Sequence, residues 1–262
     1  METSLNEQLK NTLLRALHAG ADQLKKYFDG TFEIQSKDTL NNLVTEVDEK
    51  SETAIIEVIR DEYPNDFILS EEVGELSTDS NVKWIIDPID GTVNFANGIP
   101  ICCVSIGVEK DGKLLMGAVF NPFMNELFFA EKGKGAFLNN KPLKVSENKN
   151  VNAACLVTGF PYRWVEVAKD PIAVFERFIR MGLPVRRLGS AAIDLCWVAA
   201  GRFDGFWEYN LNPWDIAAGY LIIEEAGGTV TNFKGEPYSV YDKETLATNG
   251  KIHEEMLHVI NE

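Results

Sequence analysis

Two carboxylates, Asp87 and Asp90, stand three positions apart directly after the apolar run 84–86. That run is short, bulky and partly β-branched, which predicts a buried strand. Open α/β sheets bind their ligands at the carboxyl ends of strands, where these two acids would lie. Pro88 fixes a backbone dihedral between them, and Ile89 offers a carbonyl oxygen. Such a set of oxygens suits a hard cation such as Mg²⁺.

A plainer interpretation is that Asp87 ends a strand while Asp90 and Gly91 form an ordinary turn. Two further acidic clusters favour the metal site over this alternative. Each of them also lies beside an apolar element of the chain.

The first cluster is Glu71 and Glu72, which follow the apolar segment 67–69 and Ser70. Adjacent side chains on a strand point to opposite faces, so we expect only one of the two to face the site. Glu71 is the candidate. Glu72 is interpreted as a solvated or supporting group.

The second cluster is Asp215, two residues after Pro213. Pro213 is typical of the first position of a helix, and an acid in the first turn often only complements the helix dipole. The helix that follows, to Ala226, is largely apolar and therefore buried. An ionised Asp beside so apolar a helix needs a partner, and a metal ion is a natural one.

Composition narrows the class of protein. The 262 residues are 45% hydrophobic and 25% charged, an ordinary globular profile. The net charge of −15 argues against direct nucleic-acid binding, which needs Lys and Arg to neutralise phosphates. It would also repel a phosphorylated substrate unless cations screen the site, and a cation-filled acidic pocket resolves that conflict.

The segment 1–10 is polar and lacks the apolar core of a signal peptide, and no apolar run approaches the length of a membrane span. The four cysteines, Cys102, Cys103, Cys155 and Cys196, show no Cys-x-x-Cys spacing. They are interpreted as buried hydrophobes, which predicts a reducing, cytoplasmic location.

The three histidines, His18, His253 and His258, lie in amphipathic patterns near the termini, remote from the acidic motifs. The chain has no His-Glu-x-x-His motif and no nucleophile elbow. Zinc hydrolase and serine hydrolase interpretations therefore lose their main support.

Periodicity predicts helices at 5–28 and 48–63, then an antiparallel meander of strands over 101–144. The polar segment 146–152 is the expected boundary between two parts. We predict an α+β amino-terminal half (1–147) with most metal ligands and an α/β carboxyl-terminal half (148–262) with Asp215.

Three separated motifs, with several supporting segments, resemble the inositol monophosphatase family, which belongs to the Mg²⁺-dependent, lithium-inhibited phosphatases. The resemblance covers nearly the whole chain. The three motifs are Ser70-Glu71-Glu72, Asp87-Pro88-Ile89-Asp90-Gly91-Thr92-Val93-Asn94-Phe95 and Trp214-Asp215-Ile216-Ala217-Ala218-Gly219. The resemblance implies an α/β fold layered as an αβαβα sandwich, an active site between the halves and a homodimer.

The resemblance also implies the metal ligands. Asp87 would bridge two Mg²⁺ ions, with Glu71 and the Ile89 carbonyl on one ion and Asp90 and Asp215 on the other. A third, weaker Mg²⁺ near Glu71 would hold the attacking water. We expect that Mn²⁺ can substitute, because both ions prefer oxygen ligands.

Catalytic and substrate roles follow from the same resemblance. Thr92 and Asp48 would form a proton-accepting pair, although Asp48 also opens a helix and can simply cap it. The backbone amides of Gly91 and Thr92 would bind phosphate oxygens. The alcohol would contact Asp90 and a further group of residues, namely Gly189, Ser190, Ala191, Ala192 and Glu208, with Lys37 on a nearby loop.

Two features leave the substrate open. Asn42 stands where the family usually has Asp, which predicts weaker binding of the loosest metal ion or a changed loop contact. Arg163, Arg186 and Arg187 can bind a second anionic group or lie at a surface or interface.

The leading hypothesis is Mg²⁺-dependent hydrolysis of inositol monophosphate by a metal-activated water. Relatives cleave other substrates, including fructose 1,6-bisphosphate, the 2′-phosphate of NADP, nucleotide 3′,5′-bisphosphates and histidinol phosphate. A different class of function, a regulatory binding protein with dispensable catalysis, is the further alternative.

Overall fold

The computed structural model describes residues 2–28, 30, 32–36, 43–161, 167 and 170–262. The helices are α1 (Glu2–Tyr27), α2 (Glu46–Glu62), α3 (Thr92–Ala96), the 3₁₀ helix η1 (Val151–Ala153), α4 (Pro171–Arg180), α5 (Ala191–Ala199), α6 (Pro213–Glu225) and α7 (His253–Asn261). The strands are β1 (Ile34–Ser36), β2 (Leu43–Thr45), β3 (Phe67–Ser70), β4 (Gly74–Leu76), β5 (Val82–Asp90), β6 (Cys103–Lys110), β7 (Lys113–Asn121), β8 (Glu126–Glu131), β9 (Gly135–Leu138), β10 (Lys141–Pro142), β11 (Leu156–Thr158), β12 (Val185–Arg186), β13 (Gly205–Tyr209), β14 (Thr229–Thr231) and β15 (Glu244–Thr248).

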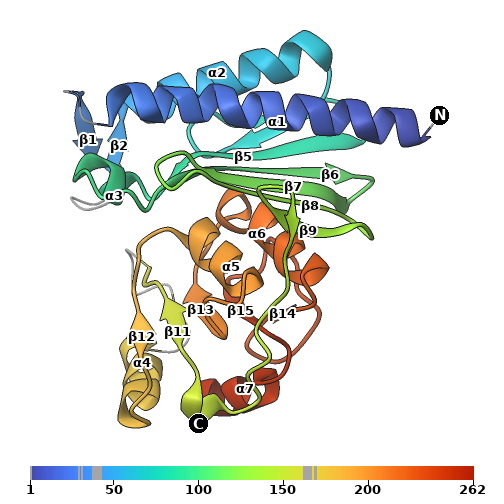
Figure 1. Cartoon of the computed structure of the whole chain (residues 1–262). Coiled ribbons are helices and arrows are strands. Elements are labelled where there is room, and N and C mark those ends of the chain that lie inside the picture. The colour runs from blue at the N-terminus through green and yellow to red at the C-terminus, as the bar shows by residue number, and fades with distance from the viewer. Residues whose placement is uncertain (1, 29, 31, 37–42, 162–166, 168–169) are drawn as a thin grey trace.

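These elements stack in five layers (Figure 1). Helices α1 and α2 cover the outer face of an eight-stranded sheet, and α5 and α6 fill the space between it and a five-stranded sheet. Helices α4 and α7 pack on the far side of the smaller sheet. The predicted αβαβα sandwich is confirmed.

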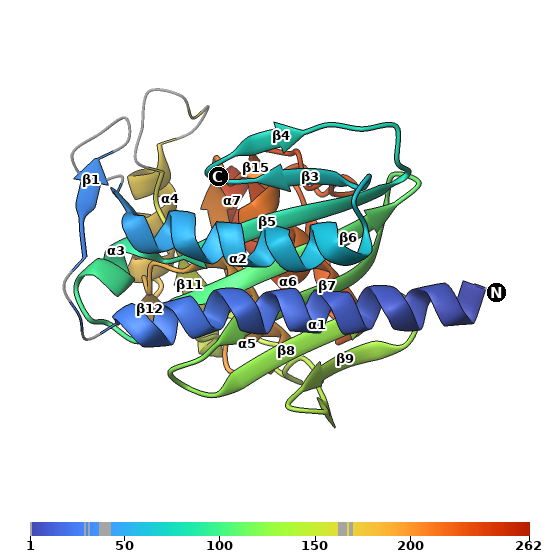
Figure 2. The same ribbon diagram turned by 90° about the horizontal axis from the view of Figure 1, so that it is seen from above.

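Helices α1 and α2 lie side by side across the larger sheet (Figure 2). The leucines expected to share one side of the first helix, Leu9, Leu13, Leu17 and Leu24, are fully buried. Such a stripe stabilises an amphipathic helix by removing apolar surface from water. Both helices begin two or three residues before the predicted positions and end one residue before them.

The larger sheet has the strand order β10-β9-β8-β7-β6-β5-β3-β4. Strand β3 runs parallel to β5, and every other neighbouring pair is antiparallel. The meander over 101–144 is therefore as predicted. Strand β5 differs from the prediction because it continues through Pro88 to Asp90, with an irregular register between Asp87 and Asp90.

Helix α6 lies unusually close to the larger sheet. Gly107 on β6 pairs directly with Gly117 on β7. A methyl group on Gly107 would lie 2.8 Å from the Cβ of Ala217, and one on Gly117 would lie 2.8 Å from the Cα of Ala218. Those distances are shorter than a van der Waals contact, so the close approach requires glycine at both positions.

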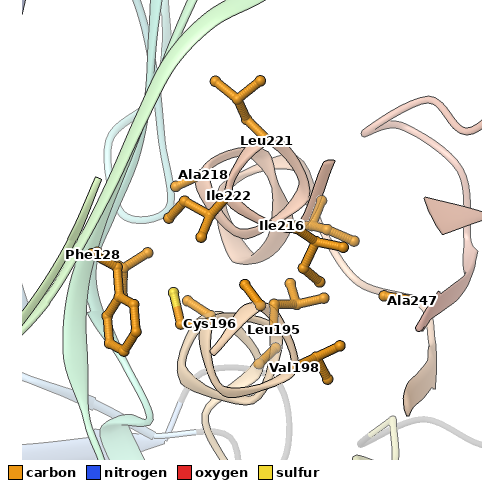
Figure 3. Packing of buried hydrophobic residues seen from close by; sticks show 14 of the residues in the cluster. Phe128, Leu195, Cys196, Val198, Ile216, Ala218, Leu221, Ile222 and Ala247 are labelled. Atoms are coloured by element: carbon orange, nitrogen blue, oxygen red, sulfur yellow. The ribbon is translucent and has the colours of Figure 1, made fainter. Parts of the chain in front are cut away.

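The central layer forms one apolar cluster (Figure 3). Leu195 of α5 points toward Ile216 of α6, Ile222 of α6 points toward Phe128 of β8, and Val198 joins the same cluster. Helices α5 and α6 are apolar on nearly all sides because they lie between two sheets.

The smaller sheet has the order β12-β11-β13-β15-β14. The segment between β10 and η1 crosses from one sheet to the other (Figure 1), and the division into halves at 147/148 remains a prediction. No helix among the described residues is both long and apolar enough to span a membrane.

Candidate active site

A cavity of about 140 Å³ opens where β5, α5, β13 and α6 meet. It contains most of the predicted site residues: Glu71, Asp87, Ile89, Asp90, Gly91, Thr92, Gly189, Ser190, Ala191, Glu208 and Asp215. Residues that are far apart in the sequence therefore line one cavity. Lys37, Asn42 and Arg163 lie outside the described residues.

The pairing of β3 with β5 brings Glu71 to Asp87. Ser70 lies opposite Ile86 in this parallel ladder, and the backbone N–H of Glu71 donates to the Ile86 carbonyl at 3.2 Å. The two acids therefore follow the ends of one register pair at the same edge of the sheet. The side chain of Glu71 is half-buried, whereas Asp87 is only 1% exposed.

Hydrogen bonds fix the orientation of polar atoms in the irregular part of β5. Oδ1 of Asp87 accepts a hydrogen bond from the Ile89 N–H at 3.0 Å. Gly91 follows with φ 88°, a conformation that favours glycine and starts the short helix α3. These bonds leave the second oxygen of Asp87 to the cavity.

Asp90 joins the two sides of the molecule. Its Oδ2 accepts hydrogen bonds from the Ser190 hydroxyl at 2.6 Å and from the Ala192 N–H at 2.7 Å. Both donors belong to the start of α5, whose dipole favours a negative charge there. Ala192 therefore acts through Asp90 and does not line the cavity, unlike Ser190 and Ala191.

Asp215 occupies the third position of α6. Its Oδ2 accepts from the Asn212 N–H at 2.7 Å, in a capping box. Asp215 thus lies in the first turn, where it complements the helix dipole as the plainer interpretation expects, and it also reaches the cavity. One carboxylate oxygen is used by the cap, and the residue also lines the cavity.

Asp48 has both of the arrangements that its sequence position allows. Its Oδ2 accepts from the N–H and the hydroxyl of Thr45, at 2.7 Å each, which caps α2. Its Oδ1 accepts from the Thr92 hydroxyl at 3.1 Å, and that hydroxyl also lies 3.0 Å from the Ile89 carbonyl. Asp48 is fully buried behind Thr92, which itself lines the cavity.

The cavity has a strong excess of negative charge. Six acidic residues and one basic residue, Arg187, line it within the described part of the chain. Burial and the carboxylate of Glu71 raise the pKa of Asp87 well above its usual range. Burial and Glu71 do the same to the pKa of Asp215, and burial raises the pKa of Asp90 to about 6. Crowded carboxylates of this kind need a cation to stay ionised.

The donor set fits a hard cation. The hydrogen bonds among described residues use one oxygen each of Asp87, Asp90 and Asp215, so each retains a second oxygen for a metal. No group of three His, Cys, Asp or Glu side chains among the described residues is arranged to hold an ion as it stands.

The opposite wall carries two further acids. Burial raises the pKa of Glu208 to about 8, helped by the charges of Asp215 and Asp90 and opposed by Arg187. Asp194 on α5 is 1% exposed, and its Oδ1 has no hydrogen-bond partner among the described residues. The sequence analysis missed Asp194, whose only signal was an acid in an otherwise apolar helix.

Arg187 lines the cavity and lies over the ring of Phe160, with 5.9 Å between the guanidinium carbon and the ring centroid. Arg186 is exposed and donates to the Val185 carbonyl. The two neighbouring arginines therefore have different surroundings, and only Arg187 can meet a molecule in the cavity.

None of the three histidines lines the cavity. His18 packs edge-on against Phe120, His258 pairs with Glu262, and His253 is buried between Thr231 and Thr248. All four cysteines are free thiols.

A layered αβαβα sandwich with a carboxylate-lined cavity between its sheets defines the class of metal-dependent phosphatases. Comparison with known proteins places the chain within that class. A model of the inositol monophosphatase family matches residues 5–262, so the chain belongs to this family. It is a hydrolase of phosphate monoesters, and the family is generally Mg²⁺-dependent.

Three relatives illustrate the similarity. The inositol-1-monophosphatase of Synechocystis sp. is 45% identical over 225 residues, which are 86% of this chain and 78% of that protein. The Nus factor SuhB of Pasteurella multocida is 40% identical over 252 residues, 95% of this chain and 94% of that protein. The solved structure of inositol monophosphatase from Anabaena (Nostoc) sp. superposes with a TM-score of 0.87 at 37% identity, covering 97% and 96% of the two chains.

Proposed function

We propose that this protein removes the phosphate from inositol monophosphate, with Mg²⁺ held by Glu71, Asp87, the Ile89 carbonyl, Asp90 and Asp215. One observation carries the proposal. Asp87, Asp90 and Asp215 each use one carboxylate oxygen in a hydrogen bond to the protein, while all three line a single cavity. The protein thereby fixes the ligands and keeps their second oxygens for the ion.

Bound Mg²⁺ supplies charge neutralisation of the phosphate and a lowered pKa for the attacking water. The chain's own contribution to proton transfer is the pair Thr92 and Asp48. The Thr92 hydroxyl orients the water and accepts a proton from it, while the hydroxyl's own proton passes to Oδ1 of Asp48, which lies 3.1 Å from Oγ1 of Thr92. Burial raises the pKa of Asp48 to about 6, so this carboxylate is ionised above that pH yet basic enough to accept a proton.

The phosphate and alcohol lie on different walls in this proposal. The amides of Gly91 and Thr92 bind the phosphate oxygens. The raised pKa of Glu208 makes it largely protonated at neutral pH, so it can both donate and accept hydrogen bonds with a sugar or cyclitol hydroxyl. Backbone groups at 189–191 and the carboxylate of Asp90 complete the contacts with the alcohol.

The charge balance of this wall favours a monophosphate over a bisphosphate. Among the described residues that line the cavity, Glu208 and Asp194 are accompanied by one cation, Arg187. A second phosphate bound here would meet one guanidinium of the described residues, whereas sugar or cyclitol hydroxyls can bond to both acids.

A substrate panel tests the proposal. The protein with Mg²⁺ is assayed for phosphate release from inositol 1-phosphate, fructose 1,6-bisphosphate, NADP, adenosine 3′,5′-bisphosphate and histidinol phosphate. We expect the highest kcat/KM with inositol 1-phosphate. A higher value for any bisphosphate would contradict the assignment of the alcohol wall.

The ion count and the ion's identity are further proposals. A pair of ions bridged by Asp87, with a third and weaker one near Glu71, predicts more than one binding phase in a Mg²⁺ titration. Mn²⁺ should support turnover and Li⁺ should inhibit it. A single binding phase in the Mg²⁺ titration, without inhibition by Li⁺, would indicate that the site binds one ion.

A second candidate function is regulatory binding. The similarity to a protein called Nus factor SuhB, over 95% of this chain, favours it. We propose it as an additional role, because the carboxylates that would hold the metal are all present. An Asp90→Asn variant that loses turnover yet restores growth of a deletion strain would establish catalysis as dispensable.

We also propose a homodimer in a reducing compartment such as the cytosol. The four free thiols support the compartment, and the family supports the dimer. Analytical ultracentrifugation tests the dimer directly.

A further inference from the structure

Helix α2 carries polar side chains on the face that packs against the larger sheet. Asp48, Ser51 and Glu52 are 0%, 0% and 7% exposed. Their spacing of three and four residues places them on one side of the helix, among positions that normally hold apolar residues. Buried polar groups destabilise a protein unless they are hydrogen-bonded, so their partners identify their use.

Glu52 bonds to the turn that carries Glu71. Its Oε1 accepts hydrogen bonds from the Ser70 hydroxyl and from the N–H groups of Glu72 and Val73, the latter two at 3.1 Å each. The donors stand on both sides of Glu71. One carboxylate oxygen thus bonds to the side chain of the residue before Glu71 and to the backbone of the two residues after it.

Ser51 bonds to the other acidic segment. Its hydroxyl donates to the Pro88 carbonyl at 2.9 Å, between Asp87 and Ile89. Helix α1 packs closely against α2 at this point, since a methyl group on Gly20 would lie only 2.9 Å from Oγ of Ser51. One rigid helix therefore reaches both acidic segments.

The two segments need such a link because their charges repel. Glu71 and Asp87 are carboxylates beside the same cavity, and unscreened like charges at short range destabilise the arrangement by several kT. The strand ladder contacts Glu71 through its N–H, which donates to the Ile86 carbonyl. Glu52 adds the three hydrogen bonds from Ser70, Glu72 and Val73.

We propose that Glu52 and Ser51 are positioning residues that hold the Glu71 turn and the Asp87–Asp90 segment at a fixed separation before any cation binds. Glu52 controls the first and Ser51 the second. This inference rests on the proposed metal ligands, but neither residue touches the cavity.

The test compares Glu52→Ala and Glu52→Gln with a control from the same helix. Glutamine keeps an acceptor oxygen and should preserve the three hydrogen bonds to the Glu71 turn. The control is Ile59→Ala, which removes a fully buried apolar side chain of α2 that makes none of these bonds. It should lower stability without removing any of the hydrogen bonds of Ser51 and Glu52.

Two measurements are made. In the metal-free protein, hydrogen exchange of the segment 67–76 should be faster in Glu52→Ala than in the parent, Glu52→Gln and Ile59→Ala. Mn²⁺ binding, followed by electron paramagnetic resonance, should weaken by about tenfold or more in Glu52→Ala alone. Unchanged exchange and unchanged Mn²⁺ affinity in that variant would overturn the inference.

Ser51→Ala provides a milder second variant should Glu52→Ala fail to fold. It should speed exchange in the segment 87–92 and leave 67–76 at the parent rate. Equal changes in both segments would show a general loosening of α2 and contradict separate control. Failure of the parent itself to bind Mn²⁺ would instead refute the proposed metal ligands.

Discussion

The two walls of the cavity, taken with the elements that support them, differ in how completely their buried polar atoms are bonded. On the wall built by α2, β3 and β5, Asp48, Ser51, Glu52 and Asp87 all have hydrogen-bond partners. Among the described residues, the three buried side-chain atoms without a partner all belong to the carboxyl-terminal part: Oδ1 of Asp194, Oη of Tyr209 and Nε1 of Trp214.

This difference separates two tasks. Carboxylates anchored by hydrogen bonds on the first wall stay in place while Asp87 keeps a second oxygen, which suits the cation and the attacking water of the proposed function. A wall with unpaired or protonated acids, such as Asp194 and Glu208, retains bonding capacity for an incoming alcohol. We therefore expect substitutions on the first wall to lower kcat and substitutions on the second to raise KM.

The largest effect is expected from Asp90→Asn, because Asp90 belongs to both walls. Asparagine retains an oxygen that can accept from Ser190 and Ala192, so the fold should persist. The lost charge should lower turnover by about 10³-fold. Phosphate release and circular dichroism measure the two properties. Parent-like turnover would show that the metal ligands are wrongly assigned.

Thr92→Val should come next. It removes the hydroxyl that contacts Asp48 and keeps the side-chain volume. We expect kcat to fall by about 10²-fold with KM nearly unchanged. Thr92→Ser, which keeps the hydroxyl, is the matched control and should retain most of the activity. A rise in KM with kcat unchanged would instead assign Thr92 to the wall that binds the alcohol.

Glu208→Gln should act mainly on KM, raising it by about tenfold, because glutamine cannot reproduce the O–H donor of the protonated acid. Glu254→Gln, on an exposed face of α7, is the control. A larger change in kcat than in KM would remove the distinction between the walls.

The same variant has a predicted pH signature. Because burial raises the pKa of Glu208 from 4.5 to about 8, the folded protein binds a proton that the unfolded chain has released. The stability from this group is complete below pH 4.5 and is lost as the pH rises through about 8. In metal-free protein, the Tm of Glu208→Gln should therefore rise relative to the parent between pH 5 and pH 9. A constant difference would contradict the shift.

Asp194→Asn should have the smallest effect. Burial raises the pKa of Asp194 well above its usual range, so ionising it at neutral pH lowers the stability of the fold. A neutral amide of the same shape should stabilise the protein by about 1 kcal/mol, measured by urea unfolding at pH 7.5. A loss of stability would show that the carboxylate has a partner in solution.

The sequence allowed the site to be predicted where chemistry is local. Asp87, Asp90 and Asp215 stand beside apolar runs whose strand or helix character is evident, and the layered fold followed from the family resemblance. The extension of β5 through Pro88 was not predictable, because proline usually ends a strand. Its place in the ladder depends on the neighbouring strand β6.

Contacts between distant residues account for the rest. Ser51 and Glu52 resemble ordinary solvent-facing residues of an amphipathic helix, and only the packing of α2 on the sheet reveals their bonds. The bond from Ser190 to Asp90 joins residues 100 positions apart. No periodicity or propensity encodes such a pairing.

The glycine pair beneath α6 has a consequence for how this enzyme can change. Gly107 and Gly117 set how deeply the helix sinks into the sheet, and the first turn of that helix presents Asp215 to the cavity. Adding one methyl group at either glycine requires the helix to rise or the strand to bend. The position of Asp215 relative to the carboxylates of β5 is thus governed by the thickness of an apolar contact, and mutations far from the cavity can change it.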